Sequence, residues 1–196
     1  LSELYMEMHR SMGPMVVNVY GNPKLQPETT RSYDFSLEME KGKNFGKLTY
    51  FNNNVTNLIS TEDLGGNTYT YVNINKAKLR GVEFEIGRHI TDRWTFKASY
   101  NYLNAMDTEY NVRLHNRARD TMTFQLIYDD HKEDGFSAVL WDQFVNRYRF
   151  NNQDYTYNTL NFSMNKKWTN SFSTYAGIDN IFNKKSGDLY IDGRLW

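Results

Sequence analysis

The chain has 196 residues with 23 basic and 23 acidic side chains, so its formal net charge is zero. Zero net charge removes the electrostatic basis for nucleic-acid binding, and the absence of cysteine excludes disulfide scaffolds, thiolate metal sites and thiol catalysis. No run approaches the roughly 18 apolar residues that a membrane helix needs. The 15 tyrosines, 12 phenylalanines and 4 tryptophans are typical of β structure or of the aromatic girdles of a transmembrane barrel.

Residues 1–28 show no clean hydrophobic period. A loose helical spacing ends before the helix-breaking pair Gly13-Pro14 and involves Leu4, Tyr5, Met8 and Met12. A short β-rich run follows at 15–20. Residues 21–29 (GNPKLQPET) contain two prolines, which forbid a helix and push the preceding residues to extended geometry.

From Thr29 onward, apolar and polar residues alternate with period 2, the pattern of strands with one apolar face. In the first segment the apolar positions are Tyr33, Phe35, Leu37 and Met39. We predict eight strands, at 29–40, 45–57, 69–87, 93–104, 119–129, 135–148, 155–168 and 172–182. A ninth is expected to start at Asp192.

The predicted connections alternate in length. Short turns at 41–44, 88–92, 130–134 and 169–171 separate longer stretches at 58–68, 105–118, 149–154 and 183–191. Outer-membrane barrels have short periplasmic turns and longer outside loops, whereas a soluble sandwich has no reason to alternate in this way. Ten residues tilted by roughly 40° climb about 25 Å, the height of the apolar band of such a barrel. The sequence therefore predicts an all-β fold, an antiparallel transmembrane β-barrel.

The chain starts at Leu1 without an initiator methionine or signal sequence, and it stops at Trp196 where a strand begins. We therefore expect a fragment of a longer barrel protein. Its expected organisation is a leading extracellular segment at 1–28 and antiparallel barrel strands at 29–196.

Several motifs resemble those of TonB-dependent outer-membrane receptors. Residues 21–29 (GNPKLQPET) resemble the family's GNPxLxPE(T/S) box, and residues 1–5 (LSELY) its SLxELY segment. Residues 71–83 (YVNINKAKLRGVE) match YxNxxKAxxxGVE. Residues 179–184 (DNIFNK) are similar to (D/N)NLFDKxY, and Gly193-Arg194 to the pair that opens the last strand.

The resemblance implies a 22-stranded barrel of which this chain supplies the C-terminal 8 or 9 strands. It also implies an N-terminal plug, contact with TonB through that plug, import of a scarce nutrient, and localisation in the outer membrane among its lipids. We expect no intrinsic cofactor. Haem or another ferric complex would instead be bound as the transported ligand. The chain departs from the family in lacking the plug, the TonB box and the closing strand.

If the short turns are periplasmic, His9 and His115 lie outside, whereas His89 and His131 lie in periplasmic turns. Receptors for haem within the family carry an NPxL box with a histidine upstream, so Asn22, Pro23 and His9 resemble that arrangement. A neutral imidazole is a natural axial ligand of haem iron, which makes His9 the candidate metal ligand. The alternative for both external histidines is an ordinary surface position.

Other external side chains could also meet a ligand. Tyr69, Tyr110, Tyr148 and Tyr155 could stack on a flat molecule or belong to an interface girdle. Arg113, Arg117 and Arg119 could meet propionates or an anionic siderophore, or instead bind lipopolysaccharide phosphates or remain solvated. Together with His9, the candidate ligand-binding residues are Asn22, Pro23, His115, Tyr110 and Arg113.

The leading hypothesis is an active outer-membrane importer of haem or another iron complex, such as a siderophore. A cobalamin receptor of the same family, a soluble all-β binding or adhesion module, and a passive porin are the alternatives. An enzyme is not expected, because no Gly-rich phosphate loop, HExxH, GxSxG or cysteine-based constellation is present.

Overall fold

The computed structural model describes residues 2–12, 15–150 and 152–186. The predicted ninth strand and the Gly193-Arg194 pair lie outside these residues. The chain divides into two units. The first comprises Leu1–Tyr33, Asn52–Leu79 and Met106–Val112, and the second comprises Asp34–Phe51, Arg80–Ala105 and Arg113–Trp196.

The described residues form one short helix and eleven strands, which confirms the all-β prediction. The bounds are α1 Ser2–Tyr5, β1 Glu7–Met12, β2 Met15–Tyr20, β3 Thr29–Lys41, β4 Asn44–Gly65, β5 Thr68–His89, β6 Trp94–Asp107, β7 Val112–Arg113, β8 Asp120–Asp129, β9 Phe136–Phe150, β10 Gln153–Thr169 and β11 Phe172–Ile178. All eight predicted strands are present, and β1, β2 and β7 are found in addition to them. Among the described residues, no helix has the length and apolar character to cross a membrane.

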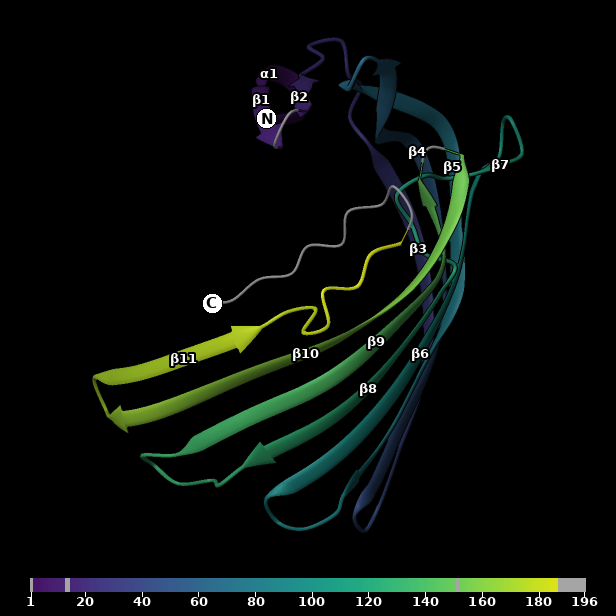
Figure 1. Ribbon diagram of the computed structural model, residues 1–196. Coiled ribbons are helices and arrows are strands. Elements are labelled where there is room, and N and C mark those ends of the chain that lie inside the picture. Colours follow the sequence, from purple (N-terminus) through teal and green to yellow (C-terminus); the bar gives the residue numbers. More distant parts are fainter. Residues whose placement is uncertain (1, 13–14, 151, 187–196) are drawn as a thin grey trace. The chain divides into compact units, whose positions relative to one another are not determined.

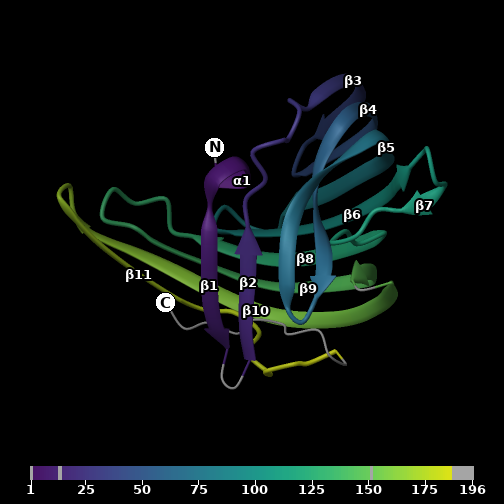
Figure 2. The same ribbon diagram turned by 90° about the horizontal axis from the view of Figure 1, so that it is seen from above.

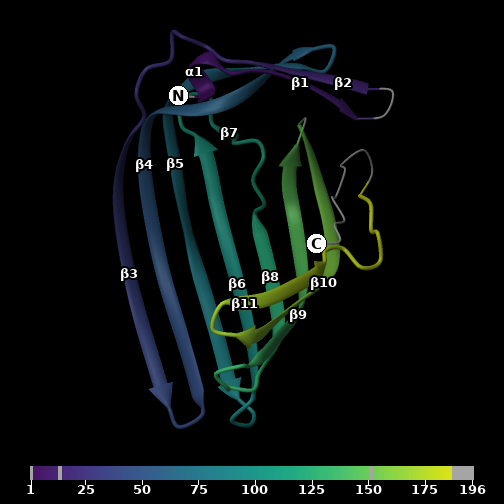
Figure 3. The same ribbon diagram turned by 90° about the vertical axis from the view of Figure 1, so that its left-hand side faces the viewer.

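Strands that follow one another along the chain mostly pair with each other. β3 pairs with β4, β4 with β5, and β6, β8, β9, β10 and β11 follow as successive neighbours. The pairs from β6 to β11 are antiparallel. Figure 1 and Figure 3 both show β6, β8, β9 and β10 side by side in this order.

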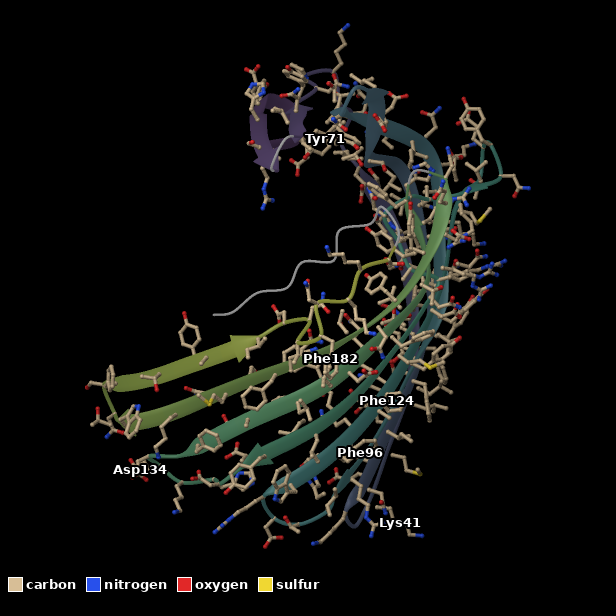
Figure 4. The ribbon with its side chains drawn as sticks, in the orientation of Figure 1. Lys41, Tyr71, Phe96, Phe124, Asp134 and Phe182 are labelled. Carbon is tan, nitrogen blue, oxygen red and sulfur yellow. The ribbon has the colours of Figure 1, made fainter. Side chains whose placement is uncertain are left out.

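The strands of the second unit have one apolar and one polar face. Cross-strand register aligns one apolar row over five strands, which consists of Phe96, Leu126, Leu140, Phe162 and Ile178. A polar row faces the other way and consists of Ser99, Thr123, Gln143 and Thr159. Figure 4 labels Phe96 and Phe124 on the neighbouring strands β6 and β8. We call the side of the sheet that carries the first row the apolar face, and the other side the polar face.

The apolar face is not covered by other described residues of this unit. On β3, Phe35, Leu37 and Met39 are 63%, 57% and 68% exposed, while the intervening residues are polar. Such exposure would be costly in water, because each buried large apolar side chain is worth about 1.5–3 kcal/mol. The pattern is that of barrel strands, whose alternate residues face lipid.

Short turns join the strands of the second unit where the sequence predicts them. Gly42 adopts a φ of 59° between β3 and β4, a conformation that costs glycine nothing. The turns between β5 and β6, between β8 and β9 and between β10 and β11 are also short. Figure 3 shows the β3–β4, β5–β6 and β8–β9 turns at one end of the strands, and Figure 4 labels Lys41 and Asp134 there.

Two glycines of β5 make room for aromatic rings of β4. A Cβ on Gly81 would lie 2.0 Å from the Tyr102 carbonyl oxygen and 2.7 Å from Cζ of Phe51. A Cβ on Gly87 would lie 2.1 Å from Cζ of Phe45, with only ring atoms of that phenylalanine among its nearest neighbours. The glycine of the GVE motif is therefore required by a close approach of backbone and ring.

In the first unit, β1 and β2 form an antiparallel hairpin next to α1 (Figure 2). Its second strand then pairs in parallel with the start of β5, where Val19 lies opposite Tyr69. Apolar side chains from the hairpin and from β4 and β5 are buried in this unit, namely Val19, Val55, Leu58 and Ala77.

Three sequence-based expectations are corrected. The loose helical spacing of residues 4–12 does not correspond to a helix beyond Tyr5, because Met8 and Met12 belong to β1 and pair with β2. The long loop at 58–68 is also wrong, since β4 continues to Gly65 and β5 starts at Thr68. Positive φ angles at Gly65, Gly66 and Asn67 allow this tight turn. The loop at 105–118 is shorter than predicted because β6 runs to Asp107 and β7 interrupts it.

Candidate functional site

His9 lies on one face of the β1–β2 hairpin. It pairs with Asn18 across the strands, and Glu7 pairs with Tyr20, so these four residues share that face. The Nδ1 atom of His9 is 2.6 Å from Oδ1 of Asn18, and its Nε2 atom is 3.5 Å from Oε1 of Glu7. The ring meets Tyr20 edge-on with centroids 5.9 Å apart.

This geometry orients the imidazole. An amide oxygen can only accept, so in the neutral ring the contact with Asn18 favours the tautomer that carries its proton on Nδ1. The Nε2 lone pair is then available, in the arrangement that metal-bound histidines commonly show. The side chain of His9 is 53% exposed, so a ligand can reach it. Among the described residues, however, no group of three or more histidine, aspartate or glutamate side chains could hold a metal ion by itself.

Asn22 and Pro23 lie at a turn, and their neighbours make structural contacts. Asn22 Nδ2 donates to the Tyr71 carbonyl at 2.8 Å, and its Oδ1 atom accepts from the Lys24 N–H at 3.0 Å. A Cβ on Gly21 would lie 2.7 Å from backbone atoms of Leu4 and Tyr5. The Gly-Asn-Pro sequence therefore places this turn against α1 and β5.

The boxes at 21–29 and 71–83 are bonded to each other. The Gln26 N–H donates to Oδ1 of Asn73 at 2.7 Å, and Asn73 Nδ2 donates to the Gln26 carbonyl at 3.0 Å. Asn73 Nδ2 also donates to the Asn57 carbonyl at 2.8 Å. In addition, Glu28 accepts from the Ile59 N–H at 3.1 Å. Two motifs that are far apart in the sequence thus form one connected structure.

Tyr110 lies at the turn that follows β6. The Asp107 Oδ1 atom accepts from the N–H groups of Glu109 and Tyr110, at 2.8 Å and 3.2 Å. Tyr110 is 73% exposed. Tyr69 pairs with Val19, also in the first unit.

His115 and Arg113 belong to the second unit. His115 Nε2 lies 3.1 Å from Oδ1 of Asn152. Arg113 Nη1 contacts both carboxylate oxygens of Asp154, at 2.8 Å and 3.0 Å, and its Nη2 donates to the Arg147 carbonyl at 2.8 Å. Tyr148 and Tyr155, which the sequence also suggested as stacking residues, are less accessible than Tyr110. Tyr155 is buried, and Tyr148 packs edge-on against Tyr157.

Arg147 and Arg149 were missed as candidates although they lie close to Arg113. Arg147 Nη2 is 2.6 Å from Oδ2 of Asp120, and Arg149 Nη1 is 3.5 Å from Oδ1 of Asp154. The run NRYRF at 146–150 carries the signal, since it interrupts an alternating strand with two cations. The register of β9 against β10 shifts at this point, and Arg147 has a φ of 53°.

Asn180 holds the turn within the 179–184 motif. Its Oδ1 accepts from the Lys184 N–H at 2.8 Å, and its Nδ2 donates to the Lys184 carbonyl at 3.0 Å. Its own N–H donates to Oδ1 of Asn161 at 2.8 Å, and both asparagines are buried. With a φ of 50°, Asn180 adopts a left-handed conformation that asparagine tolerates well.

Comparison with protein families gives one match, which covers nearly the whole chain. The family described as "TonB dependent receptor-like, beta-barrel" matches residues 1–181. Members of this family are outer-membrane β-barrels, in agreement with the predicted fold class and localisation.

Solved structures share the fold at low sequence identity. The chain is similar to the copper transporter OprC, with 20% identity, a TM-score of 0.59, and coverage of 83% of this chain and 26% of that chain. The siderophore receptor PirA from Pseudomonas aeruginosa gives 20% identity, a TM-score of 0.54 and coverage of 85% and 28%. The ferric enterobactin receptor PfeA from the same organism, in complex with enterobactin, gives 20% identity, a TM-score of 0.53, and coverage of 86% of this chain and 28% of that chain. The chain thus spans little more than a quarter of each of these proteins.

Proposed function

The chain belongs to the TonB-dependent receptors, and on that basis we propose that it forms part of the barrel wall and outer loops of an importer of metal complexes. Its role in transport would be to bind and admit the ligand, with no covalent chemistry. TonB would act through a plug segment of the full-length receptor. The observation that carries this proposal is the family match over residues 1–181.

Two further observations support a metal complex as the substrate class. The solved structures with a similar fold include proteins described as a copper transporter and as receptors for siderophores. The hairpin of the first unit also presents an oriented imidazole beside an aromatic ring, on a face that solvent reaches.

Within this class we propose haem as the first substrate to test, with His9 as its axial ligand. Asn18 would fix the ring and direct Nε2 to the iron, while the Tyr20 ring would lie along the porphyrin edge. Glu7 would have to turn away from Nε2, which its exposed position permits. A ferric siderophore is the second candidate, favoured because two of the proteins with a similar fold are receptors for siderophores.

Titration of the full-length receptor with hemin, a ferric siderophore and cobalamin tests the substrate. We expect hemin to bind most tightly, with a Soret band typical of histidine ligation that is lost in His9→Ala. His115→Ala is the matched control and should retain that band. Asn18→Ala should weaken hemin binding about 10-fold or more, as loss of an orienting partner does at metal sites.

Two results would reject the haem assignment. One is hemin binding no tighter than the other two ligands, and the other is an unchanged Soret band in His9→Ala. Tight binding of the siderophore alone would establish the second candidate instead.

A further inference from the structure

Two hydrogen-bonded polar side chains interrupt the apolar face of the second unit. Asp142 of β9 lies opposite Leu160 on β10 and opposite Phe124 on β8, which Figure 4 labels. Asn158 of β10 lies opposite Phe144, two residues beyond Asp142 on β9. Both Asp142 oxygens accept from Asn158 Nδ2 at 2.8 Å, so the amide and the carboxylate meet at one level of the sheet.

A second polar pair continues the interruption toward the end of the strands opposite the short turns. Thr156 Oγ1 donates to Asn146 Oδ1 at 2.8 Å. Asn146 alternates along β9 in step with Asp142, as Thr156 does along β10 with Asn158. We define the polar stripe as Asn146, Thr156, Asp142 and Asn158.

The inner pair of the polar stripe lies within the part of the wall that faces lipid. On β8 the apolar residues from Met122 to Tyr128 span about 20 Å at roughly 3.3 Å per residue, which approaches the height of the apolar band of a barrel. Phe124, opposite Asp142, belongs to this stretch, and both it and Leu140 of β9 are exposed. Asp142 therefore sits among lipid-facing side chains.

Lipid is a poor neighbour for this pair. Acyl chains offer neither donors nor acceptors, and a carboxylate within the apolar band is unfavourable unless hydrogen-bonding groups surround it. Ionisable side chains at membrane depth accordingly face protein or water in most membrane proteins and mark functional contacts. Because the apolar face points outward from the wall, a partner for the polar stripe comes from the surrounding membrane.

The hydrogen-bonding chemistry of the polar stripe fits a second copy of the same chain. An amide nitrogen carries two hydrogens and a carboxylate has about four acceptor sites, so Asn158 can donate to two carboxylates and Asp142 can accept from two amides. In a dimer with a two-fold axis, each surface contacts its own equivalent. Two receptors in one membrane share their orientation, so this axis follows the membrane normal and keeps every group at its depth. The amide and the carboxylate already share one depth and can therefore exchange partners between copies.

Small side chains on the same face allow two walls to approach closely. Ala98 lies in one cross-strand row with Phe124 and Asp142. Ala138 and Ala176 lie in another row, nearer the short turns. Interfaces between membrane-spanning segments combine small residues with hydrogen-bonding side chains, and the apolar face offers both.

We propose that the apolar face around the polar stripe is the contact surface of a receptor dimer, in which Asn158 of each copy donates to Asp142 of the other. The proposal rests on the membrane setting of the family. It does not depend on which nutrient the receptor imports, so a monomeric receptor would leave the proposed transport function intact.

Disulfide cross-linking of the full-length receptor in native membranes tests the contact. The chain contains no cysteine, so a thiol introduced into it reports on its own surroundings. Leu160→Cys, opposite Asp142, should cross-link to the same position of a second copy and give a product of twice the receptor's mass. Phe96→Cys is the matched control, because Phe96 lies on the same face three strands away.

Energy transfer between labelled receptors in lipid vesicles, measured over a range of protein-to-lipid ratios, gives the dissociation constant of the dimer. Asp142→Leu combined with Asn158→Leu should raise this constant about 10-fold or more, the equivalent of about 1.4 kcal/mol. Asp142→Asn should retain wild-type association, because its amide oxygen still accepts from Asn158. Gln143→Leu is the matched control, since Gln143 follows Asp142 on β9 but belongs to the polar face.

Several results would overturn the proposal. They are an unchanged dissociation constant in the double leucine variant, an equal loss of association in Gln143→Leu or Asp142→Asn, and a Leu160→Cys product no more abundant than that of Phe96→Cys. A cross-linked product of any other mass would place a different membrane protein on this face instead of a second copy. Heat-dependent electrophoretic mobility reports the folding of each variant independently of its association.

Discussion

Asn73 and Gln26 exchange two hydrogen bonds, at 2.7 Å and 3.0 Å, across 47 residues of sequence. The asparagine thereby acts as a substitute strand partner for a segment in which two prolines restrict pairing. A third bond, from Asn73 Nδ2 to the Asn57 carbonyl, ties the same side chain to β4. One amide therefore connects three segments of the first unit.

Asn73→Ala should destabilise the first unit by about 1–2 kcal/mol, because it removes the partners of three backbone groups, two of them near solvent. Asn75→Ala is the control, since Asn75 sits on the same face of β5 and its side chain donates to the exposed Glu109 side chain at 3.0 Å instead of to a backbone carbonyl. Limited proteolysis of the 21–28 segment measures the difference. Equal cleavage rates in the two variants would show that the connection is not stabilising.

The loss of folded yield caused by alanine at Gly87 should be rescued by removing the neighbouring phenylalanine ring, whereas the loss caused by alanine at Gly81 should not. Gly87→Ala brings a Cβ against the Phe45 ring, so removing that ring by Phe45→Ala should restore the yield of folded protein. Gly81→Ala also meets the Tyr102 carbonyl oxygen, so Phe51→Ala should not restore it. The yield of heat-modifiable barrel from refolding is the measurement. Rescue in both pairs would mean that the backbone shifts easily at Gly81.

Asp142 is a carboxylate within the apolar face. It pairs with Phe124 and Leu160, and both of its oxygens accept from Asn158 Nδ2 at 2.8 Å. Asn158→Leu should destabilise the barrel in lipid by about 1–3 kcal/mol, because it leaves the carboxylate without this donor. Replacing both residues by leucine should be neutral or stabilising, as for other buried polar pairs.

Urea unfolding in lipid vesicles distinguishes these variants. If the double leucine variant is less stable than Asn158→Leu alone, Asp142 has an independent stabilising role that the apolar face does not explain.

Asp130 confers a pH dependence on the β8–β9 turn. Burial raises the pKa of this carboxyl, but the N–H groups of Phe136 and Lys132, at 2.9 Å and 3.2 Å, outweigh it and hold the pKa below the ordinary value of 3.8. A depressed pKa contributes stability above the unfolded value that is lost as pH falls through the folded value. We therefore expect the difference in unfolding midpoint between wild type and Asp130→Asn to be constant above about pH 5 and to shrink below about pH 4.

The unfolding midpoint in urea, followed between neutral and acidic pH, provides the check. A difference that grows as the pH falls would contradict the proposed role of Asp130.

The strand pattern could be predicted because lipid contact enforces strict alternation. Segments such as 119–129 and 155–168 lie within two residues of β8 and β10. Prediction failed where pairing, not hydrophobicity, determines the structure. The polar stretch at 58–68 has little periodicity, yet a hairpin of backbone hydrogen bonds carries it to the Gly66-Asn67 turn.

The candidate residues were harder to assign for the same reason. The family resemblance suggested His9 as a candidate but not Asn18, which lies opposite it only because β1 and β2 pair. Similarly, Arg113 was predicted as a ligand residue, whereas its pairing with Asp154 and proximity to Arg147 depend on the register of β9 and β10. The function of the GNPxLxPE box in joining two motifs likewise requires the contacts of Asn73.

The most direct test of the account is uptake of radioactive iron by cells that carry the full-length receptor, with and without TonB. Iron supplied as haem or as a ferric siderophore should accumulate only when both the receptor and TonB are present. Equal accumulation without TonB would identify a passive pore. No receptor-dependent accumulation of either complex would contradict the proposed role in the import of iron complexes.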